Sequence, residues 1–336
     1  MSESGLVVAI VGAATELGRE VQAVLDMRGV VVADWRLYDS THEGDAIDIE
    51  ALPADLLSGE AAELDGVDLV FICAPATVAR EWAQRGSDAG ALVIDLSQGL
   101  AEDEAALIVP EVNADTIADT IGRGIFACPV SGATALAVAL KPIDEAVGLK
   151  RVVVTALESA SYRGTAGVDE LAQQSRELLT GQSVETVVFP QRMGFNLIPQ
   201  VGDFVAGGRT RGEWAIEAQT RRLLDLADLP LAVTSVHVPT FYGQAYVVHV
   251  ETERPFEAVA AAALLRVAPG LLLAEDPSLA PTLVDVVGSE ATLVGRLRDD
   301  PTVPYGVAMW VLIDGLRKGA AVNAVQIAER ALRERG

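Results

Sequence analysis

The first third of the chain alternates short runs of apolar residues with longer amphipathic segments. The apolar runs predict buried strands at 6–12, 68–74 and 92–97, and the amphipathic segments predict helices at 17–29 and 77–90. Strands that are apolar throughout and separated by helices are typical of a parallel sheet covered on both faces. The pattern therefore predicts an α/β architecture for this part of the chain.

The pattern changes after the stretch FACPVSGATALAVALKPI at 126–143. Three later runs, at 150–159, 231–239 and 245–253, are longer and alternate more between apolar and polar residues, as in an antiparallel sheet with one solvated face. An amphipathic helix is predicted at 211–228, and another at the end of the chain. These features predict a second, α+β domain.

Ser131 lies where a Pro-Gly-rich turn enters the long apolar helix of that stretch. A helix N-terminus favours negative charge because its backbone N–H groups are unpaired and its dipole is positive there. Cys128 stands three residues earlier, in an apolar context that favours a core cysteine. From these residues alone, the junction is a catalytic elbow, a rearranged elbow or an ordinary helix start.

Charge and composition narrow the class of partner. The 336 residues carry a formal net charge of -23, which argues against nucleic acid or an anionic membrane as a partner. Two cysteines without CxxC spacing indicate neither a disulfide framework nor a zinc site, and they favour a reducing, cytoplasmic compartment. The first residues lack the basic segment of a signal peptide. The apolar stretch 258–273 is interrupted by Arg266, Pro269 and Gly270, too soon to span a bilayer.

The segment VAIVGAATELGRE follows the first strand and opens a helix, which is the context of a dinucleotide-binding glycine loop. Gly12 and Gly18 are present, but Thr15 stands at the middle position. A strand-to-helix turn with two glycines is also common in α/β proteins that bind no nucleotide. The loop alone leaves both interpretations open.

Motifs along nearly the whole chain resemble the aspartate-semialdehyde dehydrogenase family. They are the glycine loop, VIDLSQGL and VPEVNA at 93–114, the stretch 126–143, SYRGTAGVDEL, FNLIPQVGDF, APGLLLAEDPSLAPT and MWVLIDGLRKGAAVNAVQIAE. The resemblance implies a Rossmann-type doubly wound dinucleotide-binding domain at 1–127. It further implies an inserted α+β dimerisation and substrate domain with a mixed, largely antiparallel sheet at 128–314, and a C-terminal helix at 315–336 that returns to the first domain. It does not by itself imply catalysis.

The residues at the family's catalytic positions are substituted. The resemblance places Ser131 at the nucleophilic cysteine, Gln244 at the basic histidine and Glu158 at the active-site glutamine. Thioester chemistry needs a thiolate and a base, serine is a far poorer nucleophile without a paired base, and glutamine takes up no proton near neutral pH. Glu158 is expected to repel acidic substrates, unless burial raises its pKa and makes it a base.

The substrate positions also differ. The resemblance places His237 at the arginine that meets the substrate carboxylate, Gln219 at a glutamate and Ala101 at the arginine that meets phosphate, while Arg222 keeps a positive charge. An imidazole lacks the bidentate fork of a guanidinium. Arg222 is either a contact for a small acidic metabolite or a solvated residue at a helix end.

On the cofactor side, the resemblance implies contacts from one set of residues: Gly12, Ala14, Thr15, Glu16, Leu17, Thr41, Ala74 and Gly315. Thr41 stands where NADP-dependent members have an arginine, and acidic residues surround it, so NAD is favoured over NADP if either binds. Pro75 removes a backbone donor after the second apolar strand of the pattern. His42 and His249 are interpreted as a loop residue and a strand residue, and neither has the spacing of a metal ligand.

Two functions follow from the sequence. The first is a homodimeric, cytoplasmic binding or regulatory protein that has lost the parent activity and associates with itself or with the true dehydrogenase. The alternative is an NAD(P)-dependent oxidoreductase of altered mechanism or substrate that uses Ser131, Glu158 and Arg222.

Overall fold

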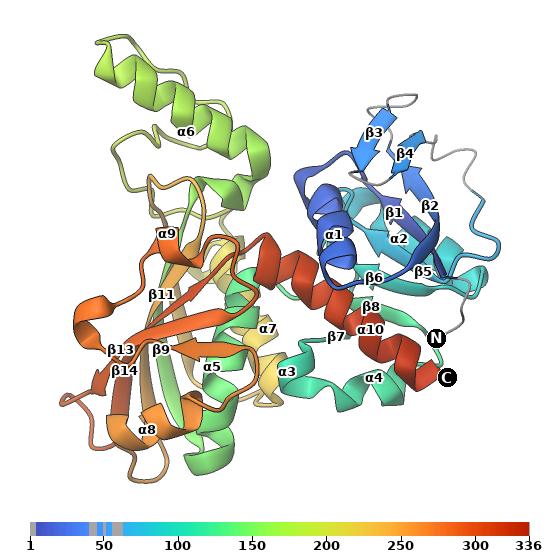
Figure 1. The fold of residues 1–336 in the computed structure, drawn as a ribbon. Coiled ribbons are helices and arrows are strands. Elements are labelled where there is room, and N and C mark those ends of the chain that lie inside the picture. The colour runs from blue at the N-terminus through green and yellow to red at the C-terminus, as the bar shows by residue number, and fades with distance from the viewer. Residues whose placement is uncertain (1–4, 40–45, 50–51, 56–62, 336) are drawn as a thin grey trace. The chain divides into compact units, whose positions relative to one another are not determined.

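The computed structural model describes residues 5–39, 46–49, 52–55 and 63–335 (Figure 1). The chain divides into two compact units, the first formed by Met1–Pro129 with Ala320–Gly336 and the second by Val130–Gly319. The chain thus passes between the units just before Ser131 and just after Gly319. The family resemblance predicts these two transitions at 128 and 315.

The first unit contains a parallel sheet with the strand order β2-β1-β5-β6-β8-β7. Its strands are β1 (Leu6–Val11), β2 (Val32–Tyr38), β5 (Leu69–Ile72), β6 (Leu92–Asp95), β7 (Ala106–Leu107) and β8 (Ile125–Ala127). A separate hairpin joins β3 (Ala46–Ile49) to β4 (Leu52–Asp55). The helices are α1 (Glu16–Met27), α2 (Ala76–Asp88), α3 (Pro110–Asn113), α4 (Asp115–Thr120) and α10 (Asn323–Arg335).

Both faces of this sheet are covered. One apolar core includes side chains of α1 and α10, and another, on the opposite face, includes side chains of α2. The central strands β1 and β5 are apolar throughout because helices cover both faces of the sheet there. The predicted doubly wound α/β domain is confirmed.

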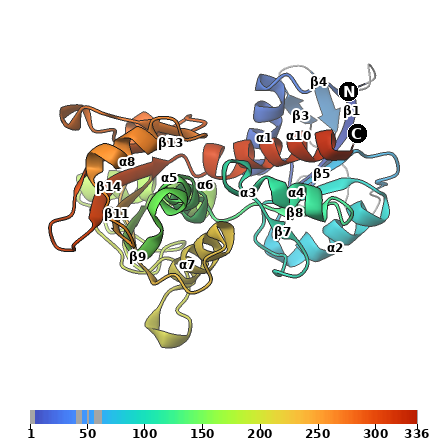
Figure 2. The same ribbon diagram turned by 90° about the horizontal axis from the view of Figure 1, so that it is seen from below.

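The second unit is built on a mixed sheet with the order β10-β9-β11-β14-β13-β12. Its strands are β9 (Leu149–Glu158), β10 (Leu231–His237), β11 (Gln244–Thr252), β12 (Leu271–Leu273), β13 (Thr292–Asp299) and β14 (Gly306–Ile313). Its helices are α5 (Ser131–Val147), α6 (Gly164–Leu179), α7 (Arg211–Leu224), α8 (Ala258–Leu265) and α9 (Leu283–Val286). Figure 2 shows α5, α7 and α8 along this sheet.

The pairing in this sheet is mixed and largely antiparallel, as the resemblance implies. The antiparallel arrangement expected from alternation alone is wrong for β9 and β10, which run parallel, and β12 and β13 at the other edge are parallel as well. The reason for the first pair is that α6 and α7 lie between β9 and β10 in the chain, and such a long crossover returns the chain to the same end of the sheet. β11 pairs antiparallel with both β9 and β14.

Helix α7 protects β10, which is the edge strand of the sheet. The carboxylate of Glu213 accepts the backbone N–H of Ser235 at 2.9 Å, and Glu217 accepts that of Val233 at 3.1 Å. Glu213 also completes a capping box with Thr210 at the start of the helix. Unpaired edge groups invite pairing with other chains, so these buried carboxylates stabilise the fold and close the edge.

Helix α6 stands away from the sheet of its own unit (Figure 1) and organises the loop that follows it. Buried Glu170 accepts the backbone N–H groups of Val187 and Val188. One turn later, the amide oxygen of Gln174 accepts those of Met193 and Gly194, each at 2.9 Å. Two helical side chains thus hold a segment that has no regular secondary structure.

The last segment differs from the single helix predicted by its apolar spacing. Residues Arg317–Val322 form a π-helical turn, and the α-helix begins only at Asn323. The side-chain amide of buried Asn323 donates to the Ile108 carbonyl at 2.9 Å, which ties α10 to the first unit. Across the described residues, none of the helices is long and apolar enough to cross a membrane.

Candidate functional site

The sheet register brings together three residues that are far apart in the sequence. Glu158 ends β9, His237 ends β10 and Gln244 begins β11. Glu158 lies directly opposite Gln244 in the antiparallel pair and opposite His237 in the parallel pair. Residues in register share one face of a sheet. Three of the positions singled out by the resemblance thus form one row at the end of the sheet.

Ser131 joins this row from the first residue of α5. Its hydroxyl donates to the Gln244 amide oxygen, with an Oγ to Oε1 distance of 2.5 Å. The phenolic oxygen of buried Tyr246 lies 3.2 Å from the same amide oxygen and 3.4 Å from Glu158 Oε1. An amide oxygen accepts hydrogen bonds but takes up no proton at neutral pH. The Ser131 proton is therefore held by a group that cannot act as a base.

Glu158 is a buried acid, since its side chain is 1% exposed. Desolvation raises its pKa to about 8, and the hydrogen bond to Tyr246 opposes this shift. In the described part of the chain, Glu158 Oε2 has no hydrogen-bond partner. The carboxyl is therefore mostly protonated near neutral pH. This is the raised pKa that the sequence analysis left open for Glu158, and a protonated carboxyl carries no charge to repel acidic substrates.

His237 lies in an aromatic environment. Its ring makes edge contacts with Phe189 and Tyr162, at centroid distances of 5.2 and 5.6 Å. Burial lowers the pKa of His237 to about 4, so the ring is neutral at physiological pH. Nδ1 lies 3.3 Å from the Glu158 backbone carbonyl. Because a carbonyl only accepts, Nδ1 carries the proton and Nε2 carries the lone pair.

Gln219 and Arg222 lie one turn apart on α7. The Gln219 amide oxygen accepts the backbone N–H of Val130 at 2.7 Å, so this residue holds the chain at the start of α5. Arg222 is half-buried in the last turn of α7. Ala101 is exposed and belongs to the first unit, where its backbone N–H donates to Glu104.

Two glycines make room for this arrangement. A Cβ on Gly315 would lie 2.8 Å from Gln244 Oε1, and a Cβ on Gly319 would lie 2.5 Å from the Cβ of Ser131. Any side chain at 315 therefore competes with the Gln244 amide for space. Gln244 and Gly315 therefore form a sterically matched pair.

The glycine loop of the first unit is explained largely by packing. Gly12 has φ +84° and a Cβ there would lie 2.8 Å from the backbone nitrogen of Ala74, while a Cβ on Gly18 would lie 2.3 Å from the Gly12 oxygen. Thr15 caps α1 by accepting the Gly18 N–H at 3.0 Å. Thr15 thus satisfies a helix N–H group that would otherwise be free for an anion.

The remaining cofactor positions lie near this loop. Ala14 donates its backbone N–H to the Asp39 carboxylate at 3.3 Å, directly after β2. Glu16 and Leu17 form the start of α1, and Pro75 is the residue before α2. A carboxylate after the second strand is what the ribose of NAD requires in a doubly wound fold. Thr41 and His42 lie outside the described residues.

The cysteines are core residues, as expected for Cys128. Cys128 is 2% exposed and lies in an apolar cluster of the first unit with Cys73. Burial raises the pKa of the Cys73 thiol, which keeps it protonated. His249 is on β11, with Nδ1 2.8 Å from Asp300. The described residues contain no cluster of three or more His, Cys, Asp or Glu suited to a metal.

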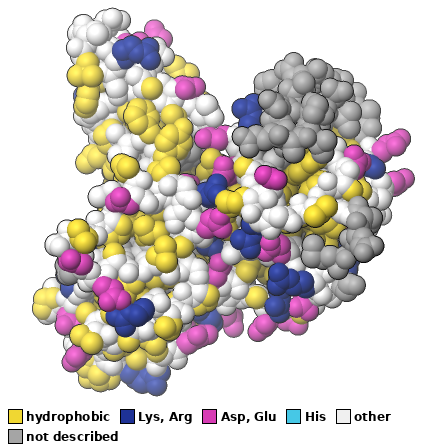
Figure 3. All heavy atoms as spheres, viewed as in Figure 1, with side chains coloured by type: hydrophobic (Ala, Val, Ile, Leu, Met, Phe, Trp, Pro, Cys, Tyr) yellow, Lys and Arg dark blue, Asp and Glu magenta, His cyan; other side chains and the backbone are white. Residues whose placement is uncertain are grey.

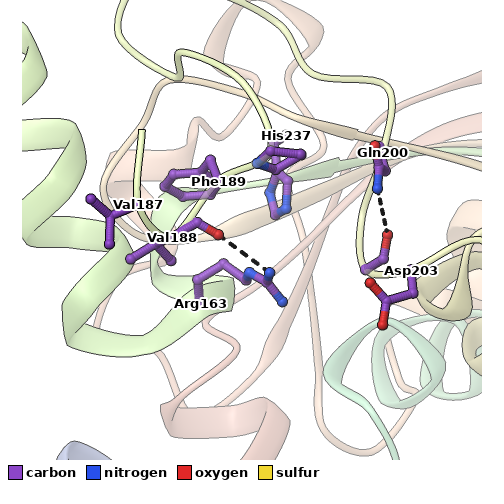
Figure 4. Close-up of a pocket in the computed structure, with 9 residues that line it drawn as sticks. Arg163, Val187, Val188, Phe189, Gln200, Asp203 and His237 are labelled. Carbon is purple, nitrogen blue, oxygen red and sulfur yellow. Dashed lines mark hydrogen bonds between the residues drawn. The ribbon is translucent and has the colours of Figure 1, made fainter. Parts of the chain in front are cut away.

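Two features of the second unit were not predicted from the sequence. The first is Tyr246, which follows Gln244 by two residues on β11. Strand periodicity in the sequence alone would have placed both residues on one face. A pocket of about 190 Å³ beside His237 is lined by Arg163, Gln200 and Asp203 among others (Figure 4). Nothing in the sequence signals that these separate segments meet.

Both units match known domain models. Residues 7–120 match the semialdehyde dehydrogenase NAD binding domain, and residues 140–318 match the semialdehyde dehydrogenase dimerisation domain. With the doubly wound first unit and the mixed sheet of the second, they define a protein of the semialdehyde dehydrogenase class. The dimerisation-domain match supports a homodimer.

Comparison with individual proteins is more specific. The chain is 36% identical to aspartate-semialdehyde dehydrogenase 2 of Vibrio cholerae over 329 residues, which cover 97% of this chain and 98% of that one. It is 33% identical to the USG-1 protein homolog of Azotobacter vinelandii over 329 residues, with the same coverage. A crystal structure of aspartate semialdehyde dehydrogenase II from Vibrio cholerae, complexed with ASA, has a TM-score of 0.94 at 36% identity and covers 98% of each chain. The chain belongs to the aspartate-semialdehyde dehydrogenase family.

Proposed function

We propose that this chain is a ligand-binding, self-associating member of the family that does not catalyse the parent dehydrogenase reaction. The observation that carries the proposal is the 2.5 Å hydrogen bond from the Ser131 hydroxyl to the Gln244 amide oxygen. The nucleophile position thus holds a hydroxyl, and its partner is a group that cannot accept its proton.

The neighbouring groups do not replace the missing base. Glu158 is mostly protonated near neutral pH because its pKa is about 8. Among the described residues, its carboxyl contacts the network through Tyr246, whose hydroxyl also interacts with Gln244 and Ser131; burial raises the pKa of Tyr246, so this hydroxyl stays protonated and is not a base. Cys128, the thiol closest in sequence, belongs to the core of the other unit. These observations support loss of thioester chemistry over an enzyme of altered mechanism.

An activity assay tests the proposal. Purified full-length protein is incubated with aspartate semialdehyde, phosphate and either NAD or NADP, and the reduced nucleotide is measured at 340 nm. We expect turnover to be roughly 1,000-fold or more below that of a family member that has cysteine and histidine at the positions of Ser131 and Gln244, because both the nucleophile and the base are absent. Turnover within about tenfold of such an enzyme would refute the proposal.

A variant that carries the family's residues at three positions makes this test more specific. Ser131→Cys with Gln244→His and Gly315→Asn restores the thiol, the base and the residue that the family has at 315. We expect thiolate formation in this variant, measured as faster alkylation by iodoacetamide near neutral pH than in Ser131→Cys alone. Equal alkylation rates would show that residue 244 does not control the group at 131.

For the cofactor, we propose that NAD is favoured over NADP. The Asp39 carboxylate after β2 accepts the Ala14 N–H and suits a ribose hydroxyl, whereas a 2′-phosphate would meet its negative charge. Calorimetric titration of the full chain with each nucleotide tests this preference. Binding of NADP tighter than that of NAD would contradict it.

For self-association, we propose that the exposed apolar face of the second unit contacts a second copy of the chain. Figure 3 shows hydrophobic side chains gathered on the face that carries α6 and α9. In the same unit, Val284 of α9 is 84% exposed, and Leu197 and Phe204 of the loop between α6 and α7 are 59% and 63% exposed. Their position within the segment that matches a dimerisation domain supports this partner.

Sedimentation measures this association. We expect Leu197→Asp with Phe204→Asp to shift the protein toward monomer, and the control Val31→Asp, 64% exposed in the first unit, to leave it unchanged. An unchanged dimer in the double variant would refute the assignment. Co-purification with an active family member from the same cell tests hetero-association through the same face.

A further inference from the structure

The pocket beside His237 has features of a binding site for a small molecule. Its lining residues all belong to the second unit and come from Arg163 just before α6, from the segments 187–190 and 200–203, and from His237 at the end of β10. Its volume of about 190 Å³ is below the roughly 300–1,000 Å³ of pockets for drug-sized ligands. The space therefore suits a metabolite of about the size of an amino acid.

The walls of this pocket are held in place. Glu170 binds the backbone N–H groups of Val187 and Val188 from α6. On the opposite wall, the Asp203 carbonyl accepts the Arg211 N–H at 2.8 Å. A site whose walls are fixed before binding loses less conformational entropy when a ligand enters.

The pocket carries one positive and one negative side chain. Arg163 and Asp203 lie on opposite sides of it, and their charged groups point into the space between them (Figure 4). The Arg163 guanidinium donates one hydrogen bond, to the Val188 carbonyl at 3.3 Å. Among the described residues, no ion pair joins the guanidinium to a carboxylate. Both charges are therefore available to a ligand.

His237 adds a neutral hydrogen-bond acceptor to the pocket. The protonated Nδ1 of His237 faces the Glu158 carbonyl, so Nε2 is the accepting atom on a ring that lines the pocket. Asp203 and His237 thus accept hydrogen bonds, while Arg163 donates them. A ligand with a carboxylate alone would meet the Asp203 charge, and one with an ammonium group alone would meet that of Arg163.

We infer that this pocket binds a small zwitterion, with the ligand carboxylate on Arg163 and its ammonium group on Asp203 and His237. The inference goes beyond the proposed function because it assigns a ligand class to a pocket built from residues outside the family's substituted catalytic positions, apart from His237. It does not depend on whether the dehydrogenase reaction is lost.

Ligand-observed NMR titration of the full chain tests the inference. The probes are L-alanine, which carries both charges, and propionate and ethylamine, which carry one each. We expect L-alanine to bind at least tenfold tighter than either half-molecule. Equal binding of propionate would indicate a simple anion site and refute the inference, as would no detectable L-alanine binding up to 100 mM.

Two variants locate the binding. Arg163→Gln and Asp203→Asn each remove one charge from an exposed residue, so neither is expected to unfold the protein. We expect each to weaken L-alanine binding at least tenfold, and the control Arg192→Gln, an exposed arginine that does not line the pocket, to leave it unchanged. Unchanged binding in both pocket variants would overturn the assignment. The dehydrogenase assay does not measure L-alanine binding. Failure of this inference can therefore be distinguished from failure of the proposed function.

Discussion

The contact between Gly315 and Gln244 leads to a quantitative prediction. A methyl group at 315 would lie 2.8 Å from Gln244 Oε1, 2.9 Å from Cδ and 3.0 Å from Nε2. Those atoms end a flexible side chain, so the amide moves rather than the backbone. Movement breaks its hydrogen bonds to Ser131 and Tyr246.

The magnitude follows from two opposing terms. Loss of one or two buried hydrogen bonds costs about 1–2 kcal/mol of the free energy of unfolding. The φ of Gly315 is not in the left-handed region, so alanine also restricts the unfolded chain and stabilises by about 0.4–1 kcal/mol. Gly315→Ala is therefore expected to destabilise the protein by a net amount of about 1 kcal/mol. In a Gln244→Ala background the first term is absent, and the same substitution becomes neutral or stabilising.

A double-mutant cycle measures this difference by urea denaturation of the four proteins. The expected coupling between 244 and 315 is about 1–2 kcal/mol. Gly122→Ala, where a Cβ would meet nothing within 4 Å, is the control for the effect of alanine on the unfolded chain. A coupling below about 0.3 kcal/mol, within the error expected for independent sites, would refute the steric argument.

Three further predictions concern single side chains. The pKa of Glu158 is raised to about 8 in the folded state, whereas the unfolded chain loses this proton above a pKa near 4.5. The free energy of unfolding should therefore fall as pH rises between these two values. Glu158→Gln should flatten the resulting fall in Tm between pH 5 and 8. A slope identical to that of the unmodified protein would show that Glu158 does not titrate as argued. Glu170→Ala should lower the free energy of unfolding by about 2–3 kcal/mol and should speed proteolysis within 183–190. The same substitution at the exposed Glu185 should do neither. Asp39→Ser should lower the ratio of NAD to NADP affinity in calorimetry, and an unchanged ratio would count against the role proposed for this carboxylate.

Much of the fold was predictable from local patterns. Fully apolar strands between helices predict the covered parallel sheet, and the loss of that pattern after residue 143 predicts a second kind of sheet. Alternation could not predict that β9 and β10 run parallel, because side-chain periodicity is the same in both orientations. It also could not predict the π-helical turn at Arg317–Val322, since spaced apolar residues are compatible with a continuous α-helix.

The sequence by itself determined the family, through motifs spread along the chain, and the chemical types of the residues at 131 and 244. A serine is not a thiol and a glutamine is not a base in any fold, so these limits on the chemistry need no coordinates. The charge states and the contacts were decided only by tertiary structure. Burial protonates Glu158 and neutralises His237, and register sets both beside Gln244. Desolvation and proximity are properties of the packed chain, which is why Arg163 and Asp203 share a pocket that no spacing in the sequence indicates.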